Sequence, residues 1–170
     1  KAHFLEPGID DLISKYKDKS FFCLDTVPEN VEFDYVIISV GTPYNKTNAY
    51  VDLRSMEAAL SSTANVISDR TLVVLRSTVS VTTSRGFVYE KLKTFGVTSP
   101  KIAFCPERTV EGKALTELNT LPQIVGALDD ASMEMAERFF SNISTMHTMS
   151  DVNLNKGKSQ IKQITILLVM

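Results

Sequence analysis

The sequence predicts an α/β domain in which helices cover both faces of a parallel β-sheet. Three observations support this prediction: strand-like and helix-like segments alternate, the strand-like segments are continuously apolar, and polar clusters follow three of them directly. Continuous apolarity is typical of strands that are buried on both faces. Right-handed crossovers then distribute the helices over the two faces of the sheet.

The amino-terminal half begins with a predicted helix at 7–16, whose apolar residues recur at helical spacing. The short apolar run 21–25 is a strand candidate. The β-branched run "YVIISV" at 35–40 predicts a strand that is buried on both faces. A second amphipathic helix of about four turns is expected over 52–68.

The carboxyl-terminal half repeats this alternation. It contains predicted strands at 71–77, 101–105 and 123–127 and predicted helices at 82–96 and 129–143. Gly96 stands where a glycine commonly ends a helix. Asp129 or Asp130 is expected to cap the last helix, because a carboxylate can accept the free N–H groups of a first turn.

Composition narrows the function classes. The 170 residues include 18 basic and 20 acidic side chains, and a net charge of -2 argues against a nucleic acid or an anionic membrane surface as partner. The longest apolar run, 164–170, is too short to span a bilayer, which needs about 20 residues. No signal peptide is visible and the chain starts at Lys1, so we expect a cytoplasmic protein whose true start lies upstream.

The two cysteines and two histidines predict neither disulfides nor a metal site. Cys23 and Cys105 lie in apolar runs without a CxxC pattern, which predicts two reduced, buried thiols. His3 and His147 have no partner at ligand spacing, so we predict that no metal is bound.

Polar clusters follow three predicted strands at the point where each strand ends. The clusters are Gly41-Thr42-Pro43, Arg76-Ser77-Thr78-Val79 and Cys105-Pro106-Glu107-Arg108. Ligands of open α/β sheets bind at the carboxyl ends of the strands, so the clusters are expected side by side at one edge. This edge is the predicted functional site.

Two of the clusters also have plain structural interpretations. Gly41-Thr42-Pro43 is suited to close approach of a ribose or phosphate, but it is also an ordinary turn. The hydroxyls of Ser77 and Thr78 can bind a ligand or cap the following helix. Arg76 can serve the site or pair with a surface carboxylate.

The third cluster has the most specific chemistry. Glu107, partly desolvated at a strand end, is expected to have a raised pKa and to serve as a general base. Arg108 offers forked donors to carbonyl or phosphate oxygens. The structural alternative is a solvated charged loop whose Arg–Glu pair contributes little to stability.

Four motifs, taken in order, resemble one enzyme family. They are "FLEPGIDDLI", "VGTP", "LRSTVSVTT" and "AFCPERTVEGKALTELNTLPQIVG". Together they resemble the NAD-dependent nucleotide-sugar dehydrogenases of the UDP-glucose and GDP-mannose 6-dehydrogenase type, over residues 4–143. The arginine in "PER" is similar to the branch that acts on UDP-N-acetylhexosamines such as UDP-N-acetylglucosamine and UDP-N-acetylmannosamine.

The resemblance implies a Rossmann-like domain of an enzyme that oxidises the C6 alcohol of a UDP-sugar to the uronic acid. It also implies NAD as cofactor, a role in polysaccharide biosynthesis and a homodimeric full-length parent. Carried over by motif, the catalytic residue is Glu107 and the substrate-binding residues are Arg108, Thr109 and Val110. The cofactor-binding residues are Gly41, Thr42, Pro43, Ser77, Thr78, Val79 and Glu111.

The chain also departs from the family pattern. The fingerprint GxGxxG is absent, so the first βαβ unit is missing and the Rossmann-like sheet is incomplete, with a gap between 21–25 and 35–40. The family's nucleophilic cysteine lies in a later domain, and Cys105 does not match it. We expect a partial NAD-binding domain at 4–150 and a tail of unclear origin at 151–170. The apolar end 164–170 is expected to add a strand or to promote aggregation.

Three hypotheses about function follow. The first is that the chain is part of a UDP-N-acetylhexosamine 6-dehydrogenase and is inactive alone. The second is a non-catalytic Rossmann-like remnant or interaction module, which the missing fingerprint favours. The third is another NAD-dependent family, such as the 2-hydroxyacid or 6-phosphogluconate type, against which "PERTVEG" argues.

Overall fold

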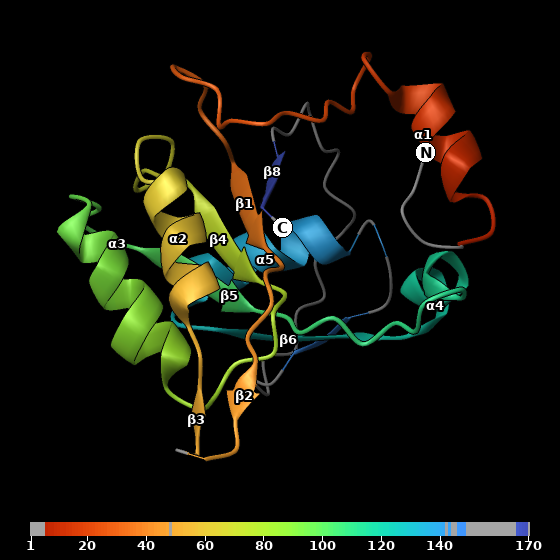
Figure 1. The fold of residues 1–170 in the computed structure, drawn as a ribbon. Helices are drawn as coiled ribbons and strands as arrows, with labels where there is room; N and C mark the ends of the chain where they lie inside the picture. The colour runs from red at the N-terminus through yellow and green to blue at the C-terminus, as the bar shows by residue number, and fades with distance from the viewer. Residues whose placement is uncertain (1–5, 48, 142, 144–145, 149–165, 170) are drawn as a thin grey trace.

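The computed structural model describes residues 6–47, 49–141, 143, 146–148 and 166–169. Within these residues a six-stranded sheet has the strand order β7-β6-β5-β4-β1-β8, with helices on both faces (Figure 1). Its strands are β1 (Tyr35–Ile38), β4 (Leu72–Leu75), β5 (Lys101–Phe104), β6 (Gln123–Ala127), β7 (Met146–Thr148) and β8 (Ile166–Val169). A separate antiparallel pair joins β2 (Tyr44–Asn45) to β3 (Tyr50–Val51).

The helices follow the alternation that the sequence predicts. They are α1 (Ile9–Tyr16), α2 (Arg54–Ser62), the π-helix η1 (Thr83–Tyr89), α3 (Glu90–Thr94), α4 (Ala114–Thr120) and α5 (Asp130–Phe140). In Figure 1, α2 and α3 lie on one face of the sheet and α5 lies on the other, while α1 and α4 lie together beyond the sheet. The predicted α/β architecture with helices on both faces is therefore confirmed.

The strands that carry the site run parallel. β1 pairs with β4 in the register Tyr35↔Leu72, and β4 pairs with β5 in the register Leu72↔Lys101. Each of these strands therefore ends at the same edge of the sheet.

The prediction of an all-parallel sheet is wrong at β6, which runs antiparallel to β5. The reason is that the chain does not cross back over the sheet after β5. Gln123, at the start of β6, lies within hydrogen-bonding distance of Arg76, which directly follows β4. β6 thus starts at the edge where β5 ends and returns in the opposite direction.

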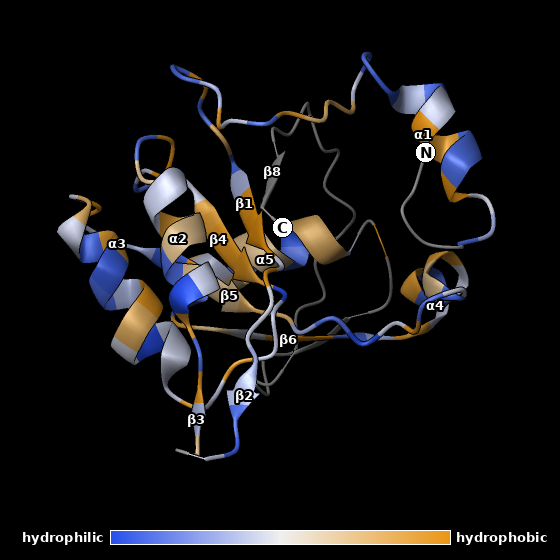
Figure 2. Ribbon diagram, viewed as in Figure 1, coloured by the Kyte–Doolittle hydropathy of each residue, from blue (hydrophilic) through white to orange (hydrophobic). Residues whose placement is uncertain are grey.

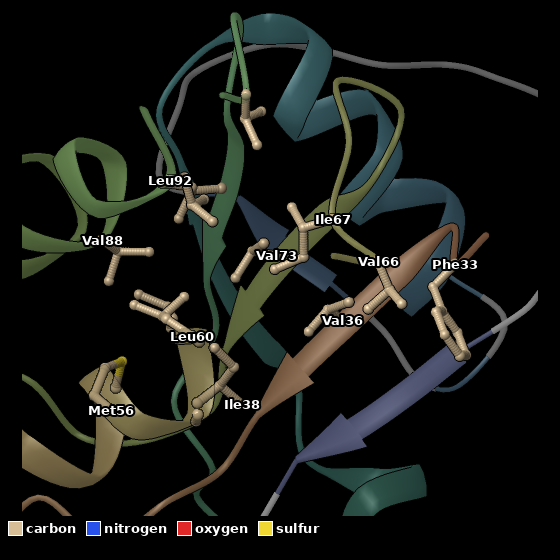
Figure 3. Packing of buried hydrophobic residues seen from close by; sticks show 14 residues of the cluster. Phe33, Val36, Ile38, Met56, Leu60, Val66, Ile67, Val73, Val88 and Leu92 are labelled. Atoms are coloured by element: carbon tan, nitrogen blue, oxygen red, sulfur yellow. The ribbon is translucent and has the colours of Figure 1, made fainter. Parts of the chain in front are cut away.

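Side chains of each central strand alternate between two apolar clusters, as the pleat of a strand requires. Toward α2 and α3, Val36, Val73 and Ile102 pack against a cluster that includes Met56, Leu60, Val88 and Leu92 (Figure 3). Toward α5, Leu72, Val74 and Ala103 pack against Ala136 and Phe140. Figure 2 shows this concentration of apolar residues in β1 and β4. Burial on both faces explains why these strands read as continuous apolar runs.

The helix predicted over 52–68 is shorter in the structure and ends at Ser62. The hydroxyls of Ser62 and Thr63 donate to the Ala59 carbonyl, each at 2.9 Å. Such back-bonding competes with continuation of the helix. Val66 and Ile67 nevertheless remain buried, although neither is helical.

Two helix ends match their predictions. Gly96 has φ +88 just after α3, which is the left-handed conformation of a terminating glycine. The Asp129 carboxylate accepts the Ser132 N–H at 2.7 Å and so caps α5. The predicted helix 82–96 forms as η1 followed by α3.

The predicted strand at 21–25 does not form, because no strand among the described residues lies beside it. Phe21 makes one isolated bridge to Lys17, and the following residues are extended but unassigned. Phe22 and Cys23 are exposed, so the prediction of a buried Cys23 is wrong. Cys105, in contrast, is buried as predicted.

The last described strand fills the sheet next to β1. β8 pairs with β1 in parallel, from Tyr35↔Ile166 to Ile38↔Val169. The expectation that the apolar end adds a strand is confirmed. It covers the edge of β1 that would otherwise carry unpaired N–H and C=O groups.

Candidate cofactor and substrate site

The first two polar clusters meet at the carboxyl ends of β1 and β4. The Thr42 hydroxyl donates to the Thr78 carbonyl at 2.5 Å. The Ser77 hydroxyl donates to the Val40 carbonyl at 2.7 Å. The helix-capping interpretation of Ser77 is therefore wrong, because its hydroxyl is used between strands while η1 begins only at Thr83.

The third cluster joins the second through Arg76 and Glu107. The Glu107 N–H donates to the Arg76 carbonyl at 3.0 Å, and the Arg76 guanidinium forms an ion pair with the Glu107 carboxylate. The three clusters therefore lie at one edge of the sheet, as predicted. They do so because β1, β4 and β5 are neighbours, and each adjoining pair of clusters is hydrogen-bonded.

Arg76 is buried, with only 9% of its side chain exposed. Its Nη1 donates to Cys105 Sγ at 3.0 Å and to Gln123 Oε1 at 2.9 Å, and its Nη2 donates to Glu107 Oε2. The ring of Phe140 lies 5.7 Å from the guanidinium carbon. Both interpretations of Arg76 hold, because its ion-pair partner Glu107 is an exposed carboxylate and is also the candidate catalytic residue.

The Glu107 carboxylate is held at both oxygens. Oε1 accepts the N–H groups of Arg108 at 2.8 Å and Thr109 at 2.9 Å, while Oε2 accepts from Arg76. Partial burial raises the pKa of Glu107, but the bonds from Arg76 and the backbone outweigh it and lower the pKa to about 2. The expected raised pKa is therefore wrong, and the carboxylate is ionised at neutral pH.

The predicted substrate-binding residues lie in the loop between β5 and α4. Arg108 is exposed and its Nη1 donates to the Pro122 carbonyl at 3.2 Å. Thr109 is half-buried, and Val110 is exposed while its N–H donates to the Glu117 carboxylate at 2.7 Å. Glu111, also exposed, lines an open hollow of about 300 Å³ together with Glu6, Thr109 and Ala114.

The remaining predicted cofactor residues lie around the Thr42–Thr78 contact. Gly41 and Pro43 are exposed, and Val79 is half-buried against the core. A Cβ placed on Gly41 would meet no heavy atom within 4 Å. Neither its backbone conformation nor the packing of the described residues therefore requires a glycine at this position.

Two residues of the site escaped the sequence analysis. Glu6 is buried, and its carboxylate accepts the N–H groups of Gly112 at 2.9 Å and Leu115 at 3.1 Å, which fixes the start of α4. Gln123 is the buried acceptor that orients Arg76. In the sequence, the only signal for Glu6 is its place in "FLEPG". The signal for Gln123 is that a polar residue begins an apolar strand, because a buried polar side chain needs a specific hydrogen-bond partner.

The described part of the chain has neither a metal-site cluster nor a membrane-spanning helix. No cluster of three or more histidine, cysteine, aspartate or glutamate side chains there has the arrangement of a metal site. No helix among the described residues has the length and apolarity to cross a membrane.

The sheet and its polar edge define a Rossmann-like α/β domain whose candidate ligand site lies at the carboxyl ends of β1, β4 and β5. Residues 1–144 match the sequence model of the UDP-glucose/GDP-mannose dehydrogenase family, NAD binding domain. The chain belongs to this family. The cofactor predicted from the motifs, NAD, is the one that the family domain binds.

A curated relative agrees with this assignment, and solved structures share the fold. A UDP-N-acetyl-D-mannosamine dehydrogenase of Campylobacter jejuni is 31% identical over 150 residues, which are 82% of this chain and 36% of that protein. The chain thus spans about a third of the length of the curated relatives that it matches. Its fold resembles the UDP-N-acetyl-mannosamine dehydrogenase of Staphylococcus aureus, with a TM-score of 0.73 and 24% identity over 89% of this chain and 38% of that one. A UDP-D-ManNAc dehydrogenase of Pyrococcus horikoshii gives a TM-score of 0.74 at 23% identity, over 86% and 36% of the two chains.

Proposed function

We propose that this chain is part of an NAD-dependent nucleotide-sugar 6-dehydrogenase, which oxidises the C6 hydroxyl of a UDP-N-acetylhexosamine to the uronic acid. The substrate class rests on the relatives, which include UDP-N-acetyl-D-mannosamine dehydrogenases and an NDP-N-acetyl-D-galactosaminuronic acid dehydrogenase. The Arg108 of "PER" supports the same class. The chain alone is proposed to be inactive.

The observation that carries the proposal is an edge on which the segment 76–78 is hydrogen-bonded to both of its neighbours, to Thr42 through Thr78 and to Glu107 through Arg76. It joins a glycine-containing segment, an exposed threonine and a carboxylate, which follow three adjacent parallel strands. An open α/β sheet binds its ligand at this edge.

In this proposal, Gly41, Thr42 and Pro43 contact the dinucleotide, and Ser77, Thr78, Val79 and Glu111 line it. The open space beside Gly41 fits the close approach of a ligand backbone. Bound NAD⁺ would accept the hydride that leaves C6. The pyrophosphate cradle of a GxGxxG turn is not part of this sequence, so these residues fit one side of the cofactor only.

Glu107 and the loop that follows it are proposed to serve the sugar. Arg108, Thr109 and Val110 bind the substrate, and the ionised Glu107 orients a hydroxyl or water at the reacting carbon. A carboxylate with a pKa of about 2 is a weak base, so its main contribution is to accept a hydrogen bond and to stabilise positive charge.

Calorimetry tests this proposal. The chain would be extended at its amino terminus with the first βαβ unit of the Campylobacter jejuni relative, and titrated with NAD⁺ and then with UDP-N-acetylglucosamine and UDP-N-acetylmannosamine. We expect NAD⁺ to bind to the extended chain and Thr78→Val to weaken it. A folded extended chain that binds neither NAD⁺ nor UDP-sugar would overturn the proposal.

For the whole protein we propose a cytoplasmic homodimer with no nucleic-acid or membrane partner, as the near-neutral charge suggests. Sedimentation of the full-length protein tests the dimer.

One observation favours the second candidate, a non-catalytic Rossmann-like module. In the usual strand order 3-2-1-4-5-6, the strand that bears the glycine fingerprint lies next to the fourth strand. With the first βαβ unit missing, β1 of this chain stands for the fourth strand. Its neighbour here is β8, which therefore occupies the place of the fingerprint strand, and Ile166–Val169 carries no glycine. If the 170-residue chain retains this arrangement in the parent protein, NAD⁺ will not bind, and calorimetry on the full-length parent distinguishes the two candidates.

A further inference from the structure

Arg76 has a setting unlike the other arginines that form ion pairs among the described residues. Arg54 and Arg70 are well exposed, whereas the Arg76 side chain is 9% exposed. A buried guanidinium is costly unless it is paired and hydrogen-bonded. Among the described residues, its carboxylate partner in an ion pair is Glu107. The buried charge therefore depends on an ionised Glu107.

Contacts on the other side of Arg76 fix its orientation. Nη1 donates to Gln123 Oε1 at 2.9 Å and to Cys105 Sγ at 3.0 Å, from the start of β6 and the end of β5. Because a guanidinium is planar, these contacts determine where Nη2 points. Nη2 is directed at Glu107 Oε2.

With respect to the described residues, the carboxylate of Glu107 is thereby left with one open acceptor position. Oε1 is filled by the N–H groups of Arg108 and Thr109. Oε2 accepts from Arg76 and, as a carboxylate oxygen, can accept one further hydrogen bond. The Glu107 side chain is 44% exposed, so this position is reachable by a water or a substrate hydroxyl.

We infer that Arg76 is a positioning residue: it holds the Glu107 carboxylate in one orientation, with a single Oε2 acceptor position open at the strand edge. It also links the cofactor cluster, which begins at Ser77, to the substrate loop, which begins at Arg108. The consequence for catalysis rests on the proposed function, whereas the effect of Arg76 on Glu107 does not.

The test is an NMR titration of the 170-residue chain, with ¹³C-labelled glutamate side chains and Glu107 assigned through Glu107→Gln. Arg76→Met is expected to raise the pKa of Glu107 from about 2 toward its ordinary value of 4.5, because the bonds from Arg76 are lost while those from the backbone remain. Arg76→Lys, which keeps the charge but loses the planar fork, is expected to give an intermediate pKa and serves if the methionine variant does not fold. Arg70→Met, on an exposed arginine, is the control and is expected to leave Glu107 unchanged.

Backbone signals give a second readout. The amides of Arg108 and Thr109 are expected to shift in the Arg76 variants but not in Arg70→Met, because their acceptor is the carboxylate that Arg76 holds. An unchanged Glu107 pKa in Arg76→Met, or in Arg76→Lys alone if only that variant folds, would overturn the inference. An unchanged pKa would overturn only the role of Arg76. Failure of the proposed function is detected by a different measurement, calorimetry with NAD⁺.

Discussion

Thr42 and Thr78 are 36 residues apart in the sequence, and the hydroxyl of the first donates to the carbonyl of the second at 2.5 Å. This bond joins the segment after β1 to the segment after β4. Because the two strands run in parallel register, their ends meet, and one short hydrogen bond makes the two halves of the candidate cofactor site a single surface.

Removing this bond should weaken both the fold and cofactor binding. Thr42→Val is expected to lower the free energy of unfolding by about 1 kcal/mol, since the Thr78 carbonyl loses its donor. Urea denaturation measures this change. Thr42→Ser, which keeps the hydroxyl, is the matched control. A Thr42→Val variant as stable as the wild type would show that the bond contributes nothing to stability.

Two glycines should respond differently to alanine. Gly96 has φ +88, so Gly96→Ala should cost about 1–2 kcal/mol of stability. At Gly41 a Cβ meets no atom within 4 Å, so Gly41→Ala should change the free energy of unfolding by less than about 0.5 kcal/mol.

The same Gly41→Ala variant, placed in the extended chain, should bind NAD⁺ more weakly, because the added methyl group occupies space proposed for the cofactor. Thermal unfolding measures the stability of the glycine variants, and calorimetry measures the NAD⁺ affinity of Gly41→Ala. Unaltered NAD⁺ affinity would remove Gly41 from the proposed site.

The ion pair of Glu107 predicts a pH dependence of stability. The folded pKa is about 2 and the ordinary value is 4.5, so the folded chain binds fewer protons than the unfolded chain between these values. The contribution is therefore fully present above pH 4.5 and is lost as the pH falls toward 2.

We expect this loss to be about 1–2 kcal/mol, less than the full linkage value because the Glu107 side chain is 44% exposed. Urea denaturation of the wild type and Glu107→Gln between pH 2 and 6 measures it. The difference in stability between the two proteins should shrink as the pH falls. A difference that stays constant with pH would show that Glu107 titrates normally.

Loss of β8 should expose the edge of β1. A chain that ends at residue 165 lacks the four residues Ile166–Val169 that pair with β1. We expect faster amide hydrogen exchange in Val36–Ile38 and more self-association, since an unpaired edge accepts strands of other chains. A chain that lacks only Met170 is the control. Equal exchange in the two truncated chains would show that β8 does not protect β1.

Much of the fold could be read locally. The runs 35–40 and 71–75 predict β1 and β4 because strands buried on both faces need apolar residues throughout. Gly96 and Asp129 mark helix ends because their backbone and side-chain preferences act over one turn. The three clusters at one edge follow from parallel order alone.

The strand prediction at 21–25 failed for a different reason. An apolar run forms a strand only where another strand offers its edge, and no described strand does so at Phe21. The direction of β6 was likewise settled by where the chain lies after β5 rather than by the residues of 123–127.

The sequence by itself therefore determined the order of elements, the family and the set of polar residues at the strand ends, because each of these depends on residues that are close together in the chain. The tertiary structure alone decided the direction of β6, the place of β8 and the state of Glu107. The last of these shows why: its pKa depends on a guanidinium 31 residues away in the sequence, and only folding brings the two charges together.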